Sequence, residues 1–223
     1  MKKNKIFIAC DSTNLSKIKN IIKNTKTSKL KVGYKFGLEF LNSKNGRLYL
    51  EKVKNKIIFA DLKIHDIPNT CVSTIKAIKD LKVNYLTIHI SAGYDALKAS
   101  KKVCGNIKLV GVTTLTSLDN KALKYIGFNK NLNNLVLHQA RLAAKSNLDG
   151  LVCSAHEVKI VKKIFKKEII TPGIRFNSIT HDQKRIMTPK EAFNNGSDWL
   201  VIGRPITKGN IKNNLNKLIE HLG

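Results

Sequence analysis

Short, almost continuously apolar runs alternate along the chain with longer stretches in which apolar residues recur at helical spacing. A short apolar run without polar alternation is typical of a parallel β-strand that is buried on both faces. The runs predict eight strands, at Lys5–Cys10, Leu30–Gly33, Lys56–Ala60, Tyr85–His89, Ile107–Thr113, Gly150–Cys153, Glu168–Thr171 and Trp199–Ile202.

Helical periodicity fills most of the intervals between these runs. Val72, Ile75, Ile78 and Leu81, for example, are spaced so that they share one face of a helix. Several such stretches begin just after Ser or Thr, residues that cap helix N-termini. Helices are therefore predicted at Asn14–Asn24, Pro68–Asp80, Ala92–Cys104, Leu132–Ser146, His156–Phe165, Pro189–Asn194 and Ile211–Leu222.

The alternation of eight strands with helices over 223 residues predicts a compact (β/α)8 TIM barrel. Because there is no Pro- or Ser-rich linker and no internal repeat, residues 1–223 are expected to form a single domain. An open, doubly wound sheet is the alternative fold. A dinucleotide site of that fold is disfavoured because no G-x-G-x-x-G sequence follows a strand.

The charge of the chain is unusual, with 41 Lys and Arg against 15 Asp and Glu and a formal net charge of +26. Such an excess often indicates nucleic-acid binding. Here the lysines are spread over the whole chain, and no basic helix carries interleaved aromatic residues. Lys, Asn and Ile are all abundant, as in proteins encoded by A/T-rich genomes, so no nucleic-acid partner is predicted. A basic surface could still steer an anionic substrate towards a site.

Neither a membrane nor a secretion signal is predicted. The apolar runs fall far short of the roughly 20 residues that span a bilayer. The run Ile6–Cys10, which follows the basic start of the chain, is too short for a signal peptide. A cytoplasmic location is therefore expected. No two cysteines form a CxxC pair, so Cys10, Cys71, Cys104 and Cys153 are interpreted as small buried hydrophobic residues.

Polar residues gather where the predicted strands end. In a TIM barrel the functional groups lie at the carboxyl ends of the strands. A charged side chain buried there costs several kcal/mol unless it is paired, so this pattern predicts a site. The residues concerned are Asp11, Lys31, Asp61, Lys63, His89, Ser91, Thr113, Thr114, Thr116, Arg175, Gly203 and Arg204.

The densest group of charges follows the third predicted strand. Asp61 and Lys63 are two residues apart on an extended segment, so both side chains should point the same way. Asp66 follows on the loop, and Lys31 would add a second ammonium from the neighbouring strand. Such an array can hold a lysine charged yet desolvated, ready to protonate a carbanion. Lys35 competes with Lys31, but the position immediately before Val-Gly favours Lys31.

The sequence Asp61-x-Lys63-x-x-Asp66-Ile67-Pro68-Asn69-Thr70 resembles the signature of the bacterial-type orotidine 5′-phosphate decarboxylase family. The resemblance extends along the chain in the family's order. It covers Phe7–Asp11, Lys31–Gly33, His89–Gly93, Val112–Ser117, Asp149–Ala155, Thr171–Arg175, Asp182–Pro189 and Val201–Ile206.

The resemblance implies conversion of orotidine 5′-phosphate to uridine 5′-phosphate, the last step of de novo UMP synthesis, with neither cofactor nor metal. It implies that Lys63 protonates C6 of the pyrimidine, that Asp61 lies beside the substrate carboxylate, and that Lys31 and Asp66 complete the array. It further implies a homodimer in which Asp66 and Thr70 reach into the partner's site.

Roles in substrate binding follow from the same resemblance. Asp11 would bind the ribose hydroxyls and Thr116 would lie near the base. The segment Arg175–Asp182 is expected to close over the site. The 5′-phosphate would be held by Arg175, Gln183, Gly203 and Arg204.

The chemistry of this reaction agrees with the residues present. Loss of carbon dioxide from an orotate ring leaves a carbanion without an adjacent electron sink, and most such reactions recruit a cofactor. The sequence carries no pyridoxal, thiamine or metal-binding pattern, so electrostatic preorganisation is the remaining means. Repulsion between Asp61 and the substrate carboxylate would be relieved as neutral carbon dioxide forms.

Two alternatives stay open at this point. A metal-dependent phosphosugar decarboxylase or synthase of the same barrel group shares the Asp-x-Lys-x-x-Asp motif, but it carries a carboxylate on the second strand where this chain has Lys31. A basic nucleic-acid-binding protein is disfavoured because the charges lie at strand ends, where a large polyanion could not reach. His89 is interpreted as a core histidine, and Trp199 and Met187 as packing residues.

Overall fold

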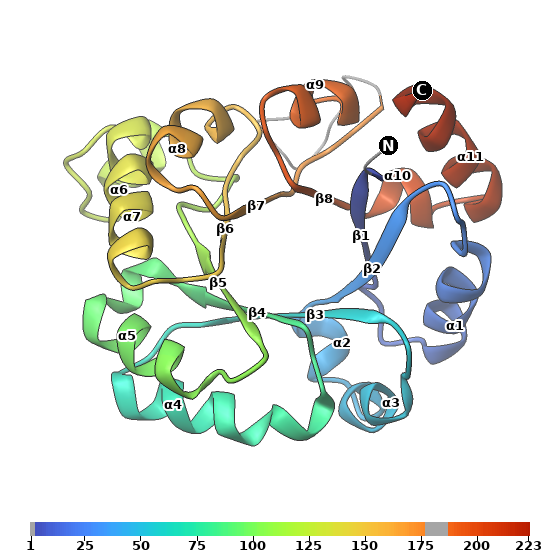
Figure 1. Ribbon diagram of the computed structural model, residues 1–223, viewed down its shortest axis with the longest axis horizontal. Helices are drawn as coiled ribbons and strands as arrows, with labels where there is room; N and C mark the ends of the chain where they lie inside the picture. Colours follow the sequence, from blue (N-terminus) through green and yellow to red (C-terminus); the bar gives the residue numbers. More distant parts are fainter. Residues whose placement is uncertain (1–2, 177–186) are drawn as a thin grey trace.

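The chain folds into a closed barrel of eight parallel strands surrounded by helices (Figure 1). The computed structural model describes residues 3–176 and 187–223. Each strand pairs with its neighbours in chain order, and β1 pairs with β8 to close the ring. The predicted (β/α)8 architecture is confirmed. The strands are β1 (Lys5–Ala9), β2 (Lys31–Phe36), β3 (Ile57–Ile64), β4 (Tyr85–His89), β5 (Lys108–Val112), β6 (Gly150–Val152), β7 (Glu168–Thr171) and β8 (Trp199–Ile202).

The helices cover the outside of the barrel (Figure 1). All seven predicted helical segments contain a helix, but the segment Pro68–Asp80 divides into a helix and a short 3-10 turn (Lys79–Leu81). Within the described residues, four short helices were not predicted: α2 (Leu38–Leu41), α3 (Gly46–Lys52), α6 (Asn120–Tyr125) and α10 (Arg204–Thr207). The others are α1 (Leu15–Asn24), α4 (Pro68–Ala77), α5 (Tyr94–Val103), α7 (Leu132–Lys145), α8 (Val158–Ile164), α9 (Pro189–Asn194) and α11 (Ile211–Leu222), with a second 3-10 turn at Ile90–Ala92.

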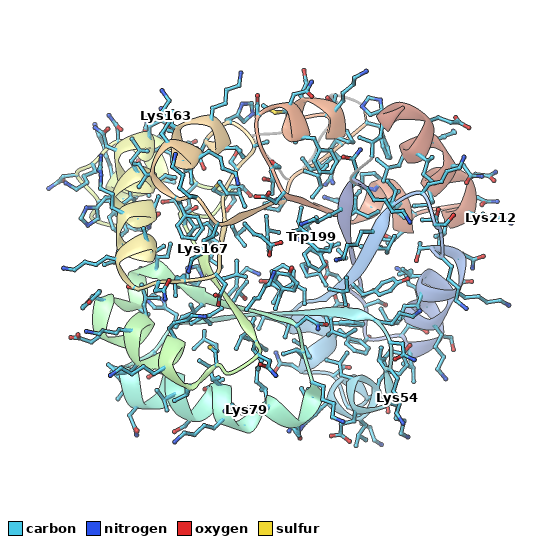
Figure 2. The ribbon with its side chains drawn as sticks, viewed as in Figure 1. Lys54, Lys79, Lys163, Lys167, Trp199 and Lys212 are labelled. Carbon is cyan, nitrogen blue, oxygen red and sulfur yellow. The ribbon has the colours of Figure 1, made fainter. Side chains whose placement is uncertain are left out.

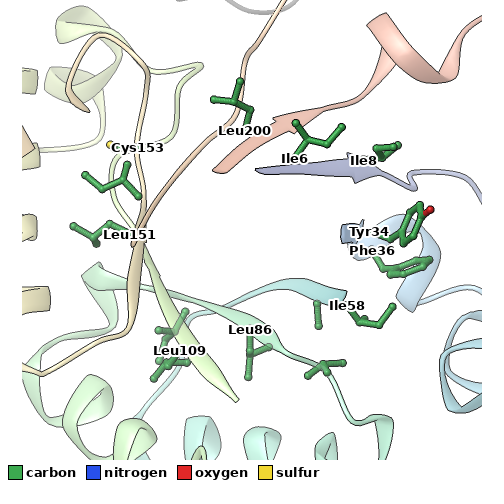
Figure 3. Packing of buried hydrophobic residues seen from close by; sticks show 14 of the residues in the cluster. Ile6, Ile8, Tyr34, Phe36, Ile58, Leu86, Leu109, Leu151, Cys153 and Leu200 are labelled. Carbon is green, nitrogen blue, oxygen red and sulfur yellow. The ribbon is translucent and has the colours of Figure 1, made fainter. Parts of the chain in front are cut away.

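Two apolar layers hold the barrel together. The larger lies between the strands and the helices, where alternate strand residues such as Ile6, Tyr34 and Leu86 point outward (Figure 3). The smaller fills the barrel itself, where Trp199 lies inside the ring of strands (Figure 2). The ring of Trp199 stacks on that of Phe7 with the centroids 4.1 Å apart. This alternation explains the continuously apolar strands, since each one contributes to both layers.

The second and third strands extend further than predicted. Strand β2 continues to Phe36 rather than ending at Gly33, and β3 continues to Ile64 rather than ending at Ala60. In β2, Tyr34 and Phe36 point into the outer layer, so Gly33 and Lys35 face the barrel axis. A side chain at Gly33 would collide with the ring of Phe7, 2.6 Å from the position of a Cβ atom.

The amino ends of the strands are closed by a cluster around Glu168. Its carboxylate accepts hydrogen bonds from Lys5 Nζ (3.2 Å) and Lys108 Nζ (2.8 Å) and from the side chains of Tyr85 (3.0 Å) and Trp199 (3.3 Å). Burial alone would raise the pKa of Glu168, but the hydrogen bonds and the charge of Lys108 outweigh it and lower the pKa from 4.5 to about 2.

Replacing Glu168 with glutamine is expected to destabilise the barrel in a pH-dependent way. Because the pKa is lower in the folded state, the ionised carboxylate stabilises the fold above about pH 4.5, and that contribution disappears as the pH falls towards about 2. Allowing for partial exposure, the contribution is about 1–2 kcal/mol. Urea unfolding of wild type and Glu168→Gln between pH 7 and 3 should show their stabilities converging. A stability difference that stays constant over this range would contradict the assignment.

The remaining fold-level predictions concern cysteines, surface charge and membranes. All four cysteines are buried and free, as predicted. Lysines such as Lys54, Lys163 and Lys212 lie at the outer edge of the molecule (Figure 2). In the part of the chain that the structure describes, no helix has both the length and the apolar character needed to cross a membrane.

Candidate active site

A cavity of about 590 Å³ lies at the carboxyl ends of the strands, above the aromatic rings in the barrel. It is lined by residues from all of the strands or strand ends except β4, with Phe59 and Val201 rising from the inner apolar layer. Of the residues predicted for the site, Asp11, Asp61, Lys63, Thr114, Thr116, Arg175, Gly203 and Arg204 line it. The structure therefore brings together groups from the first, third, fifth, seventh and eighth strands, as a TIM-barrel site requires.

Four charged groups form a row of alternating sign on one side of the cavity. Lys35 Nζ lies 3.1 Å from Asp11 Oδ1 and 3.3 Å from Asp61 Oδ2. Lys63 Nζ lies 2.8 Å from the same Asp61 oxygen. Asp61 is 8% exposed and receives both ammonium groups, so it is the centre of the row Asp11–Lys35–Asp61–Lys63.

The prediction that Lys31 belongs to this row is wrong. Lys31 is the first residue of β2, it is exposed, and it pairs with Lys5 at the amino end of the barrel. Lys35 lies four residues, or roughly 13 Å, further along the same strand and reaches the cavity. The error came from choosing the lysine immediately before Val-Gly, on a strand that was also ended too early, at Gly33. Tyr34 and Phe36, which flank Lys35 at alternate positions, indicate that the strand continues.

The two central groups of the row, Lys35 and Asp61, keep their charges because each is paired. Burial would lower the pKa of Lys35, but the carboxylates of Asp61 and Asp11 outweigh burial and raise it. Burial would likewise raise the pKa of Asp61. The charges of Lys35 and Lys63, with hydrogen bonds from Lys63 and Thr87, outweigh that effect and lower the Asp61 pKa. At neutral pH the cavity therefore holds a buried carboxylate between two ammonium groups.

Lys63 adopts an unusual backbone conformation. The pairing of β3 with β4 shifts between Ala60 and Ile64, and Lys63 has a φ of +49°, in the left-handed region. Its backbone N–H donates to the hydroxyl of Thr87 at 2.8 Å instead of joining the strand ladder. Asp61 and Lys63 do lie side by side, as predicted, but a bulge brings them together rather than regular alternation along an extended strand.

Asp66 and Thr70 do not reach the cavity of their own chain. Both are exposed, in the loop after β3 and in the first turn of α4 respectively. One carboxylate oxygen of Asp66 accepts the N–H of Ile67 at 2.7 Å. Gln183 and residues 177–182 of the predicted closing segment lie outside the described residues.

The far side of the cavity carries the groups suited to an anion. Gly203 directly precedes α10, and Arg204 is the first residue of that helix. Gly173, with a φ of +77°, turns the chain after β7 so that Arg175 lies at the cavity wall. An anionic ligand bound here would face two guanidinium groups from separate loops.

Sequence reasoning missed the residue that holds the loop after β5. Gln139 of α7 is 8% exposed, and its side-chain oxygen accepts both the N–H of Thr114 (2.9 Å) and the hydroxyl of Thr114 (3.1 Å). Thr114 and Thr116 both line the cavity. A glutamine on an Ala- and Leu-rich helix could have been noticed as a polar residue within a buried face.

His89 lies beside the site rather than in it. Its ring is half-buried and packs 5.3 Å from that of His65. Burial, with the neighbouring His65 and Lys63, lowers the pKa of His89. Trp199 and Met187 pack against apolar neighbours, as predicted.

Comparison with known proteins agrees with this geometry. Residues 4–214 match the family model described as the orotidine 5′-phosphate decarboxylase / HUMPS family. The chain belongs to this family. The match to the orotidine 5′-phosphate decarboxylase / HUMPS family covers almost the whole barrel, including the strand ends that line the cavity.

Several curated relatives carry the decarboxylase name. An orotidine 5′-phosphate decarboxylase of Wolbachia from Culex pipiens is 48% identical over 80% of this chain and 81% of its own length. That of Wolbachia from Brugia malayi is 43% identical over 97% of both chains. A solved structure, orotidine 5′-phosphate decarboxylase from Lactobacillus acidophilus, superposes with a TM-score of 0.84 at 30% identity, covering 99% of this chain and 100% of the other.

Proposed function

We propose that this protein is a carboxy-lyase that converts orotidine 5′-phosphate to uridine 5′-phosphate and carbon dioxide, the last step of UMP synthesis. The observation that carries the proposal is the row Asp11–Lys35–Asp61–Lys63 beside a cavity that ends in two arginines. Family membership over residues 4–214 supports it. The proposal includes a cytoplasmic location and a single domain over residues 1–223.

Asp61 and Lys63 would carry the chemistry. With the pyrimidine carboxylate placed against Asp61, two negative charges face each other until the C6–carboxylate bond breaks and neutral carbon dioxide leaves. The bonding electron pair stays on C6, where the Lys63 ammonium stabilises it and then donates a proton. The resulting Lys63 amine regains its proton from water, which completes the cycle.

The remaining residues of the row, Asp11 and Lys35, and the other predicted residues would bind the nucleotide. Asp11 and Lys35, paired at 3.1 Å, are suited to the ribose hydroxyls, with one acceptor and one donor. Thr116 would contact the base. Arg175, Gln183, Gly203 and Arg204 would hold the phosphate, and this remote grip would supply binding energy that positions the reacting ring against Asp61.

A direct assay tests the proposed function. Purified protein supplied with orotidine 5′-phosphate should release one carbon dioxide for each uridine 5′-phosphate formed. A protein that is folded, as judged by circular dichroism, and that binds uridine 5′-phosphate yet releases no carbon dioxide would contradict the proposal.

Activity is expected to persist after exhaustive treatment with EDTA. Both oxygens of Asp61 already accept hydrogen bonds from the protein, Oδ1 from Thr87 and Oδ2 from Lys63, and two ammonium groups would repel a divalent cation. The matched measurement is turnover before and after chelation, with and without added Mg²⁺. Loss of activity that Mg²⁺ restores would instead favour the metal-dependent phosphosugar branch of the barrel group.

We also propose a homodimer in which each subunit completes the other's site. Asp66 and Thr70 point to solvent within one chain, and the side chain of Ile67 between them is 65% exposed. An isologous contact at this rim would cover Ile67 and place Asp66 over the partner's cavity.

Mixed dimers of two inactive variants should regain activity. Lys35→Ala and Asp66→Ala damage different sites if Asp66 acts across the interface. After reassociation in equal amounts, about half of the dimers are hybrids, and each hybrid has one intact site, so about a quarter of all sites recover. The measurement is turnover of the mixture against each variant alone. No recovery despite demonstrated subunit exchange would mean that Asp66 serves its own subunit.

A further inference from the structure

The backbone of β3 breaks its pairing at the point where the proposed chemistry occurs. From Ala60 to Ile64, four steps along β3 correspond to only two along β4, from Leu86 to Ile88. The two extra residues form a bulge, and within it Lys63 has a left-handed backbone. A left-handed conformation costs a residue with a side chain roughly 1–2 kcal/mol, so neighbouring groups must hold it in place.

Thr87 is the side chain that fills the gap left by the bulge. It lies on β4 two residues after Tyr85, so it faces the barrel interior, and it is 0% exposed. Its hydroxyl accepts the Lys63 N–H at 2.8 Å and lies 3.0 Å from Asp61 Oδ1. A carboxylate can only accept, so the hydroxyl proton points to Asp61.

The Thr87 hydroxyl therefore makes two structural contributions. By accepting the Lys63 N–H, it replaces the ladder partner that the bulge removes. By donating to Oδ1 of Asp61, it fixes the orientation of a carboxylate whose other oxygen, Oδ2, faces both Lys35 and Lys63. The backbone of one proposed reacting residue and the side chain of the other are thus held by the same oxygen atom.

We propose that Thr87 is a positioning residue for decarboxylation, which sets the geometry of Asp61 and Lys63 through its hydroxyl without touching the substrate. The inference rests on the proposed roles of Asp61 and Lys63. Thr87 does not line the cavity, so its effect is exerted on the reacting groups rather than on nucleotide binding.

The test removes the hydroxyl while keeping the shape of the side chain. Thr87→Val should lower kcat about 10- to 100-fold, because it leaves a buried N–H unpaired and Asp61 free to turn. KM and the affinity for uridine 5′-phosphate should stay within about threefold, since the phosphate and ribose groups are untouched. Thr87→Ser keeps the oxygen and should keep kcat within about threefold of wild type.

Thr25 provides the matched control. It is also 0% exposed, and its hydroxyl donates to Ile21 O at 2.7 Å and contacts the hydroxyl of Tyr34 at 3.0 Å, but it follows α1 at the opposite end of the barrel. Thr25→Val loses a similar pair of hydrogen bonds and should change thermal stability without changing kcat. An equal loss of kcat in Thr25→Val would show a general packing effect and overturn the inference.

Two further outcomes would also overturn it. One is a Thr87→Val enzyme with wild-type kcat, and the other is a Thr87→Ser enzyme as impaired as Thr87→Val. If Thr87→Val does not fold, Thr87→Ser and Thr87→Ala, which differ by one oxygen atom, give the same comparison. The function and the role of Lys63 are tested separately. A wild-type protein that releases no carbon dioxide would contradict the proposed function, and an active Lys63→Ala enzyme would contradict the role of Lys63. An inactive Lys63→Ala enzyme beside a fully active Thr87→Val would contradict only the role of Thr87.

Discussion

Replacing Lys63 with alanine is expected to lower kcat at least about 10²–10⁴-fold, the usual cost of removing a general acid. Lys63 Nζ, 2.8 Å from Asp61 and on the cavity wall, is the closer of the two ammonium groups beside the carboxylate that would face the leaving group. Binding of uridine 5′-phosphate should survive, because the groups proposed for the phosphate lie on the loops after β7 and β8. Steady-state turnover and equilibrium binding of the product measure the two effects separately.

Lys82 supplies a control for the backbone. It too has a left-handed φ, of +48°, but it is exposed and precedes β4, at the amino end of the barrel. Lys82→Ala therefore removes a lysine from a similar backbone conformation without altering the cavity, and it should retain wild-type turnover. Lys63→Ala with more than about a hundredth of wild-type kcat would mean that another group protonates C6.

A comparable loss of activity is expected for Lys35→Ala, and none for Lys31→Ala. Lys35 lies between Asp11 and Asp61 and contacts both carboxylates. Without it, the buried Asp61 keeps one cationic partner, and the substrate would face two carboxylates with no ammonium group between them. We expect kcat to fall more than about 10²-fold, with a loss of stability of about 3–5 kcal/mol, the usual cost of removing one partner of a buried ion pair. Turnover and thermal unfolding of both variants provide the measurement.

Lys31→Ala is the matched control because it changes the same residue type on the same face of the same strand. Lys31 is exposed at the amino end of β2, so its loss should leave kcat within about twofold of wild type. A larger effect on turnover from Lys31→Ala than from Lys35→Ala would restore the interpretation that the sequence alone suggested.

The contrast between these two lysines shows where sequence reasoning succeeded and where it failed. The eight apolar runs were sufficient to predict the barrel, because parallel strands buried on both faces leave a strong signal. The same signal weakens at a functional strand end, where polar residues interrupt it. Strand β2 was therefore ended at Gly33, and the lysine of the site was placed four residues too early.

The bulge in β3 could not be predicted from spacing. Residues two positions apart on a regular strand share a face, and this spacing correctly predicted that Asp61 and Lys63 lie together. The spacing gives no indication that Lys63 has a left-handed backbone. The partner that stabilises the bulge, Thr87, lies within an apolar run of another strand and reads as an ordinary strand residue. Its role depends on a contact between residues 24 positions apart in the sequence.

The four short helices were missed for a related reason. Helices α2 and α10 have four residues each, too few to show a periodic apolar face. Isolated helices of this length are unstable in water, so they form because the barrel packs against them. One of them, α10, begins with Arg204 at the cavity, and its position follows from the fold rather than from its own sequence.

The aromatic rings packed within the barrel have a consequence for how ligands exchange. Phe7, Phe59, Tyr85 and Trp199 are each no more than 5% exposed, and Glu168 ties two of them to the amino end of the described barrel. The cavity above them is a cup rather than a tunnel. Substrate enters, and carbon dioxide and nucleotide leave, over the same rim. A nucleotide product that remains bound therefore blocks the next substrate and acts as a competitive inhibitor.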